Sequence, residues 1–360
     1  MHLRMRSVRF ACLPVFSSLT LLLLFAQPRT PAPQASGAGD LTLDINVTDK
    51  NGVQVRGLQP QDFTLLDDKH PVPLSSFRAV DVNAGTPAPY IEIVLVLDAI
   101  NADVMTTTMG REGIKKFLLM NGGKLAQPAS VVVVSDQPTQ MRSKPSTDGN
   151  AQATFLDQYQ TGLRTVNRTQ GNFGVGERFQ MSMNALSSLG AYEASTPGRK
   201  LILWISPGWP LLSAGASDIT KTDQQRLLRS IVALSTQLRQ DHITLYNVET
   251  RGVDETSVAQ FTDYEQFLTG VKSVNQAYPA ALSLQVLSVQ TGGRVFNESN
   301  GLPSAIAAEI ERGAADGQAF YVVTIPSAQS DRVNEYHSLQ IKLNKPGLTA
   351  RTRTGYYAQP

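Results

Sequence analysis

The stretch Tyr90–Asp103, YIEIVLVLDAINAD, decides the fold because an apolar run in it ends abruptly at a carboxylate. Six of the seven residues from Ile91 to Leu97 are apolar, and Asp98 follows them directly. A run of this kind is typical of a strand buried on both faces of a sheet. Open α/β sheets bind their ligands at the carboxyl ends of such strands. Asp98 is therefore a candidate metal ligand, a candidate catalytic acid, or the polar end of a buried strand.

Strand-like and helix-like segments alternate on the C-terminal side of this run. Helical spacing of apolar residues follows each apolar run, and Thr222 with Gln225 indicates a capping box at the start of one helix. The pattern predicts an α/β domain at 88–316, with a doubly wound, mainly parallel sheet and helices on both faces. The further predicted strands are 129–136, 199–206 and 242–248, and the main predicted helices are 109–120, 176–195, 222–241 and 302–313.

Both ends of the mature chain have the alternating pattern of half-buried strands. LTLDINVTDKNG, from Leu41, places Leu and Ile on one face, and strand-like segments return after Gly317 without helices between them. We expect the segments 40–82 and 317–360 to pair in one β layer, forming a small β domain with the α/β domain inserted between them.

The N-terminus resembles a secretory signal. Arginines in MHLRMRSVR precede the apolar stretch FACLPVFSSLTLLLLFA, and a polar segment rich in Pro, Ala and Gly follows. We predict a signal peptide at 1–26, with cleavage near Ala26 or alternatively near Ala32 or Ala35, and a linker at 27–39. An uncleaved membrane anchor is the alternative. The predicted location is therefore exported, either periplasmic or extracellular.

Removal of the predicted signal changes the charge and the chemistry that the chain offers. The full chain has 32 basic and 30 acidic residues, and the signal takes three arginines with it, so the mature charge falls from +2 to −1. Its basicity therefore gives no reason to expect nucleic-acid binding. The single cysteine, Cys12, also lies in the signal, which excludes a disulfide, a thiol nucleophile and a cysteine metal site.

The order of motifs resembles the von Willebrand factor type A family, and in particular an exported bacterial branch common in acidobacteria. The resemblance rests on VLVLDAIN (94–101), GRKLILWISPG (198–208), ITLYNVETRG (243–252), TGGRVF (291–296) and GLTARTRTGYYA (347–358), together with the leading β segment at 47–77. It covers nearly the whole mature chain. It implies a domain that recognises proteins through the loops at the carboxyl edge of its sheet.

Metal-binding members of that family carry Asp-x-Ser-x-Ser at the end of the first strand, and a further aspartate follows the fourth strand. Here Ile100 and Ala102 stand at the two serine positions, and Pro207 stands at the second aspartate. Mg²⁺ prefers six oxygen ligands, and this set supplies too few of them. We therefore expect a degenerate metal site and no cofactor, with a rearranged Mg²⁺ or Mn²⁺ site at Asp98 as the alternative.

No assembled catalytic set is evident in the sequence. Ser206 follows a strand, but it lacks a G-x-S-x-G elbow, and the mature histidines His70, His242 and His337 are scattered. We expect a non-enzymatic protein–protein interaction or scaffolding module with a protein partner. The alternatives are metal-dependent adhesion through Asp98 and an envelope hydrolase using Ser206. The predicted binding rim contains Asp98, Asn101, Asp136, Ser206 and Trp209, and Trp209 is the expected exposed anchor.

Overall fold

The computed structural model of the chain describes residues 39–84, 89–135, 141–158, 172–209, 219–251, 263–298, 300–328 and 332–358. These residues belong to one unit, 37–360. The predicted signal peptide, almost all of the predicted linker, and Asp136 lie outside the described residues. Within them, no helix is both long enough and apolar enough to cross a membrane.

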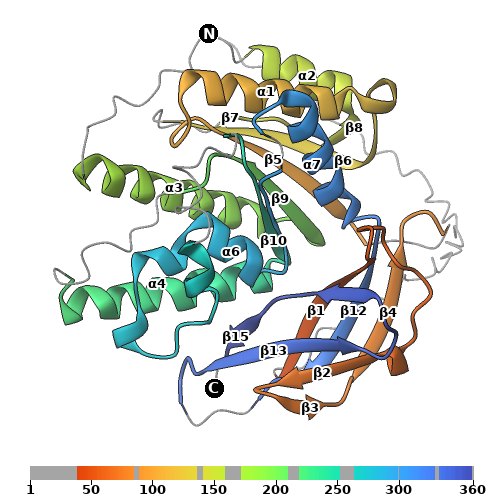
Figure 1. Cartoon of the computed structure of the whole chain (residues 1–360), viewed down its shortest axis with the longest axis vertical. Helices are drawn as coiled ribbons and strands as arrows, with labels where there is room; N and C mark the ends of the chain where they lie inside the picture. The colour runs from red at the N-terminus through yellow and green to blue at the C-terminus, as the bar shows by residue number, and fades with distance from the viewer. Residues whose placement is uncertain are drawn as a thin grey trace, which may run out of the picture. The chain divides into compact units, whose positions relative to one another are not determined.

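A mainly parallel sheet forms the centre of the α/β domain (Figure 1). Its strands lie in the order β11-β10-β9-β5-β6-β7, and β8 also pairs with β6; of the described strands only β7 and β8 run antiparallel to it. Their bounds are β5 Ile91–Asp98, β6 Lys124–Val134, β7 Met141–Arg142, β8 Ser146–Asp148, β9 Arg199–Ile205, β10 Ile243–Val248 and β11 Val295–Phe296.

Strand β5 lies in the middle of this sheet, and all eight of its residues are buried. The chain leaves β5 toward β6 and β7 on one side, and its later strands β9, β10 and β11 lie on the other side. The strand order therefore reverses between β5 and β9. In open α/β sheets this reversal separates the connecting loops and creates the usual ligand position. Asp98 ends β5 at that point, so the fold places it where function is expected.

Helices cover both faces of the sheet, so an apolar core lies on each side. Helices α1, α2 and α7 cover one face, and α3, α4 and α6 cover the other (Figure 1). The bounds are α1 Val104–Leu118, α2 Gly149–Gln158, α3 Asn172–Glu193, α4 Lys221–Gln240, α6 Leu284–Gln290 and α7 Pro303–Ala315. Short 3-10 helices are η1 Pro60–Asp62, η2 Met120–Gly123, η4 Asp263–Phe267, η5 Val274–Gln276 and η6 Pro279–Leu282.

The segments on either side of the α/β domain build a β domain of two sheets rather than the single layer expected from the sequence. One sheet has the order β14-β1-β12-β4 and the other β15-β13-β2-β3, so each mixes strands from both chain ends. Apolar side chains of the two sheets share one core. The bounds are β1 Asp40–Asp49, β2 Phe63–Asp67, β3 His70–Val72, β4 Ser76–Asp81, β12 Ala319–Pro326, β13 Tyr336–Leu343, β14 Leu348–Arg351 and β15 Gly355–Tyr357.

Asp316, directly after α7, connects the β domain to the α/β domain. Its buried carboxylate accepts two hydrogen bonds from Arg351 Nη2 at 3.0 and 2.7 Å and one from Tyr246 Oη at 2.8 Å. Its carbonyl accepts from Asn46 Nδ2 at 2.7 Å and from Arg199 Nη1 at 3.0 Å. Strands β1, β9, β10 and β14 therefore meet at one residue. Arg351 and Asp316 form the ion pair of this network, and the loss of either leaves a buried charge unpaired.

The predicted N-cap of the long helix, Thr222, is wrong, because the structure places the N-cap two residues earlier, at Thr220. Helix α4 begins at Lys221, and its N-cap is Thr220, whose side chain accepts from the backbone N of Asp223 at 3.2 Å. Thr222 therefore lies inside the helix, and the capping box predicted from it does not form. Both threonines satisfy the same sequence rule, and the backbone geometry at Thr220 decides between them.

Candidate functional site

The Asp98 carboxylate lies at the carboxyl end of β5 and has no exposed surface. Its Oδ1 accepts hydrogen bonds from the backbone N of Ile100 at 2.9 Å and of Asn101 at 3.0 Å. Its Oδ2 accepts from Asn101 Nδ2, Trp204 Nε1 and Ser206 Oγ, each at 2.9 Å. Five donors from the loop after β5, from β9 and from the loop after β9 therefore point at one carboxylate.

This set of donors leaves the Asp98 carboxylate with little capacity for an ion. An ionised carboxylate has about four lone-pair positions, and five hydrogen bonds already use them. A metal would have to displace donors that hold the loop in place. Ile100 and Ala102, at the positions where the resemblance would put serine ligands, are themselves buried and supply no side-chain oxygen. The geometry assigns Asp98 the role of an anchor for the loops at this edge.

Trp209 is buried, which corrects the expectation that it is an exposed anchor. Its exposed fraction is 2%, and its ring meets that of Trp204 edge-on, with centroids 5.2 Å apart. The turn after β9 therefore directs Trp209 back onto the sheet end. Ser206 is also fully buried. Its hydroxyl donates to Asp98 and accepts from the backbone N of Gly208 at 3.2 Å. Of the described rim residues, Asn101 alone is partly exposed.

Sequence reasoning missed Glu249 and Asn247 at the same edge of the sheet. Asn247 Nδ2 donates to the carbonyl of Ser206 at 3.1 Å, which links β10 to the loop after β9. Glu249 is 2% exposed, and its Oε1 accepts from the backbone N of Arg251 at 2.9 Å. Burial raises the pKa of Glu249 to about 7, against the opposing effect of the hydrogen bond and charge of Arg251. The rule that identified Asp98, a carboxylate directly after a buried strand, also applies to NVETRG and would have identified Glu249.

The three described histidines do not complete a hydrolase site at Ser206. His242 precedes β10 at the amino edge of the sheet, opposite Ser206. His70 and His337 belong to β3 and β13 of the β domain. The Ser206 hydroxyl therefore has a carboxylate acceptor and, among these histidines, no base within reach. In a serine hydrolase the nucleophile instead donates its hydrogen bond to an imidazole.

Asp67, Asp68 and His337 form the one group of three metal-ligand side chains within 4.8 Å found among the described residues. His337 Nδ1 lies 3.1 Å from Asp67 Oδ1 and 3.3 Å from Asp68 Oδ2. Asp67 Oδ2 also accepts from Tyr356 Oη at 2.8 Å, and Asp68 Oδ1 accepts from the backbone N and hydroxyl of Ser338. The imidazole thus pairs with two carboxylates that are already hydrogen-bonded, and the group ties β15 and β13 to the β2–β3 hairpin.

Two exposed apolar side chains lie beside the Asp98 loop. Val104 and Met105 form the first turn of α1, with exposed fractions of 62% and 71%. The N-cap Asp103 holds this turn, because its Oδ1 accepts from the backbone N of Thr106 at 2.7 Å. Among the residues that the structure describes at this edge, the exposed apolar side chains therefore belong to α1, and Trp209 is not one of them.

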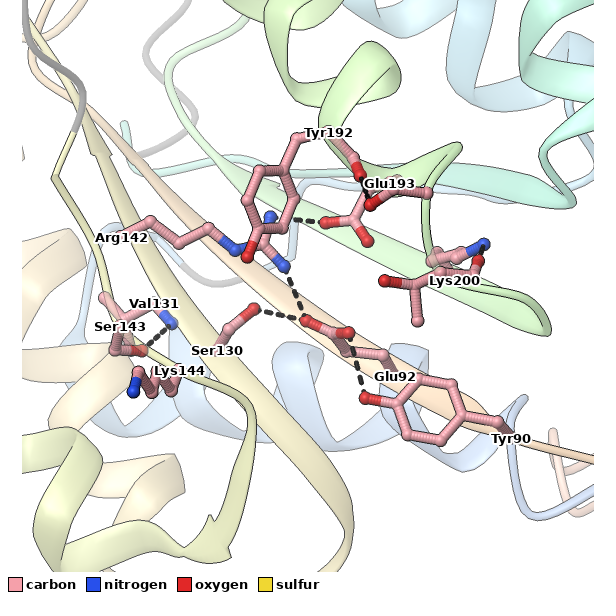
Figure 2. Close-up of polar contacts among 12 residues, drawn as sticks. Tyr90, Glu92, Ser130, Val131, Arg142, Ser143, Lys144, Tyr192, Glu193 and Lys200 are labelled. Carbon is pink, nitrogen blue, oxygen red and sulfur yellow. Dashed lines mark hydrogen bonds and ion pairs between the residues drawn. The ribbon is translucent and has the colours of Figure 1, made fainter. Parts of the chain in front are cut away.

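The amino edge of the sheet holds a buried ionic cluster (Figure 2). Arg142 of β7 lies between Glu92 of β5, whose Oε1 is 2.7 Å from Nη2, and Glu193 at the end of α3, which binds Nη1. The Tyr192 ring covers the guanidinium at 4.1 Å. Burial raises the pKa of Glu193 and lowers that of Lys200. The ion pairs of Arg142 with Glu92 and Glu193 fasten α3 and β7 to the sheet.

Comparison with known proteins gives no family assignment. No protein-family model and no curated protein matches the chain. Similar solved structures include human COPII-coat protein Sec24c (12% identity, 79% of this chain and 46% of that one, TM-score 0.33). The pilus adhesin SpaC from Lactobacillus rhamnosus GG has 9% identity over 83% of this chain and 49% of that one, with a TM-score of 0.40. A mutant PilB minor pilin from Streptococcus sanguinis has 10% identity, 79% and 80% coverage, and a TM-score of 0.35.

The chain spans about half the length of the first two of these proteins. The TM-scores and sequence identities are low for all three structures, so these similarities assign no function to the chain.

Proposed function

We propose that this protein is an exported, non-enzymatic protein–protein interaction or scaffolding module of the von Willebrand factor type A-related kind. It binds its partner without a metal ion, through the carboxyl edge of the central sheet. The resemblance of the motifs, the predicted signal and the reversal of strand order beside Asp98 support this proposal.

The observation that carries the proposal is the saturation of the Asp98 carboxylate by five donors. An adhesion site that works through an ion needs an open carboxylate, since the ion and the partner must share it. A hydrolase needs Ser206 to face a base, and its hydroxyl faces Asp98 instead. Recognition through side chains is the function that remains at this edge.

The contact surface that we propose is the first turn of α1. Val104 and Met105 present apolar side chains on a capped helix, so binding costs little backbone entropy. Methionine adapts its shape to an apolar partner surface. The partner is therefore a protein with a hydrophobic patch that accepts these two side chains.

Photocrosslinking in the producing cells tests this surface. A photoreactive phenylalanine analogue at position 105 lies at one end of α1, and the same analogue at position 119 lies just beyond the other end. Leu119 is a matched control, because it is also an exposed apolar residue, with an exposed fraction of 41%. We expect a discrete adduct from position 105, none from position 119, and the same yield in EDTA.

The alternatives give different results in the same cells. An adduct that requires Mg²⁺ or Mn²⁺ and disappears in Asp98→Ala would indicate metal-dependent adhesion. Labelling of Ser206 by a serine-reactive fluorophosphonate, lost in Ser206→Ala, would indicate a hydrolase. An adduct from position 119 of equal yield would refute the α1 surface.

A further inference from the structure

Arg353, in the segment between β14 and β15, carries a buried charge without a bonded partner. Its exposed fraction is 8%, and no hydrogen bond or ion pair links its guanidinium to any residue that the structure describes. Arg351, two positions earlier, contrasts with it because Arg351 binds both carboxylate oxygens of Asp316. Buried guanidinium groups are normally paired, since burial removes the water that would otherwise solvate them. Among the described residues, Arg353 has no directly bonded acid and only the longer-range attraction of Asp44, which points to a missing anionic partner.

A second arginine faces the same space. Arg239, in the last turn of α4, lines a pocket together with Arg353 at the junction of the β domain and the α/β domain. Burial and the neighbouring Arg239 lower the pKa of Arg353 to about 10. Neither guanidinium has a bonded acid among the described residues. Two like charges held together in this way repel each other, unless an anion lies between them.

Asp44 is the one carboxylate that lines this pocket, and it is already engaged. Its Oδ2 lies 3.5 Å from Arg199 Nε and 3.9 Å from His242 Nδ1. Burial acts to raise the pKa of Asp44, but Arg199 and His242 outweigh it and leave that pKa below its usual value. Asp44 also attracts Arg353, so this one carboxylate faces both Arg199 and Arg353. With Arg239 there are three guanidinium groups to one carboxylate, and the pocket keeps a net positive charge.

The remaining lining suits a small oxyanion. Four threonines line the pocket: Thr42, Thr244, Thr291 and Thr352. The hydroxyls of Thr291 and Thr352 already donate to the carbonyls of Ser288 and Asp44, which leaves Thr42 and Thr244 as the hydroxyl donors for an anion. The cavity volume is about 20 Å³, which admits a small ion or a water rather than a nucleotide. Guanidinium groups bind the oxygens of phosphate and similar oxyanions through paired hydrogen bonds.

We propose that this pocket binds a free inorganic oxyanion of phosphate or sulfate type, held between Arg239 and Arg353. The ion joins the two domains, because Arg353 and Thr352 belong to the terminal β segment while Arg239 belongs to α4. The site lies at the amino edge of the sheet, next to the start of β10, and is independent of the α1 surface.

Thermal unfolding of the purified chain in phosphate, with sodium chloride at equal ionic strength as the reference, tests the proposal. At a phosphate concentration about ten times its Kd, the folding equilibrium shifts about tenfold toward the native state. We expect this shift in the wild type and its loss in Arg353→Gln and in Arg239→Gln. Arg229→Gln, an exposed position on the same helix, is the matched control and keeps the shift.

A second readout separates binding from a structural role of Arg353. If the charge lacks a partner in the absence of phosphate, Arg353→Gln is at least as stable as the wild type in chloride. Stabilisation by phosphate that is no larger than by chloride in the wild type would overturn the proposal. Retention of the phosphate shift in both Arg353→Gln and Arg239→Gln would also overturn it. Stronger stabilisation by glycerol 3-phosphate than by phosphate would reject a free ion as the occupant.

Discussion

Replacing Asp98 by asparagine tests whether the carboxylate is an anchor. Oδ1 accepts two hydrogen bonds and Oδ2 accepts three, so the amide nitrogen of asparagine faces at least two donors in either orientation. Hydrogen bonds to a charged group contribute about 1.5 kcal/mol each at the low end of their range, so two lost bonds cost about 3 kcal/mol. We therefore expect Asp98→Asn to lower the free energy of unfolding by about 3 kcal/mol.

Urea unfolding followed by tryptophan fluorescence suits this measurement, because Trp204 and Trp209, the two tryptophans of the chain, both lie at the site. Asp103→Asn is the matched control: it makes the same chemical change in the same loop, and asparagine caps a helix as well as aspartate does. We expect the control to change stability by less than about 0.5 kcal/mol.

Two results would refute the reasoning about Asp98. A loss of less than about 1 kcal/mol in Asp98→Asn would mean that the five hydrogen bonds do not hold the loops. Stabilisation of the wild type by millimolar Mg²⁺, absent in Asp98→Asn, would mean that the carboxylate binds an ion and that the loop donors give way to it.

Substitutions at three other residues have defined outcomes. Glu249→Gln stabilises the protein at pH 8 and leaves it unchanged at pH 4. The raised pKa means that ionisation of Glu249 destabilises the fold as pH rises from 4.5 to about 7, by about 3 kcal/mol in a pH series of urea unfolding. Trp209→Ala costs about 3 to 5 kcal/mol in the same assay, and Trp209→Phe costs less than that because it keeps an aromatic ring against Trp204. Asp316→Ala leaves Arg351 unpaired and costs about 3 to 5 kcal/mol by calorimetry, and a smaller loss would contradict the junction network.

Periodicity in the sequence was enough to predict the mixed α/β architecture with a mainly parallel sheet. The apolar run that ends at Asp98 and the helical spacing around Ile231 both report burial directly, because β5 is buried on both faces and α4 on one. The von Willebrand-type assignment, the export signal and the absence of a cofactor stay predictions. Asp136, predicted as part of the rim, lies outside the described residues.

The details that the sequence did not predict depend on contacts between distant residues. Trp209 sits in PGWP, which is typical of an exposed turn, yet its ring packs on Trp204 because the turn folds back over the sheet end. The partners of Asp98 come from β9 and from the loops after β5 and β9, so no local pattern reveals that the carboxylate is saturated. Division of the β segments into two sheets depends on strand partners, such as Leu43 with Val323, that alternation alone does not specify.

Construction of the β domain from both ends of the chain has a consequence for how the protein is made. Asn46 and Asp316 meet although they are 270 positions apart, and β1 finds β12 at a similar separation. Pairing across such a distance is slow in an unfolded chain, because loop closure is costly before any contact repays it. A folded α/β domain removes most of that cost by holding β4 and β12 near each other at its own two ends. The insert therefore acts as an internal template for the β domain, and a nascent chain released before β15 is complete would have a finished α/β domain attached to an unassembled, aggregation-prone set of strand edges.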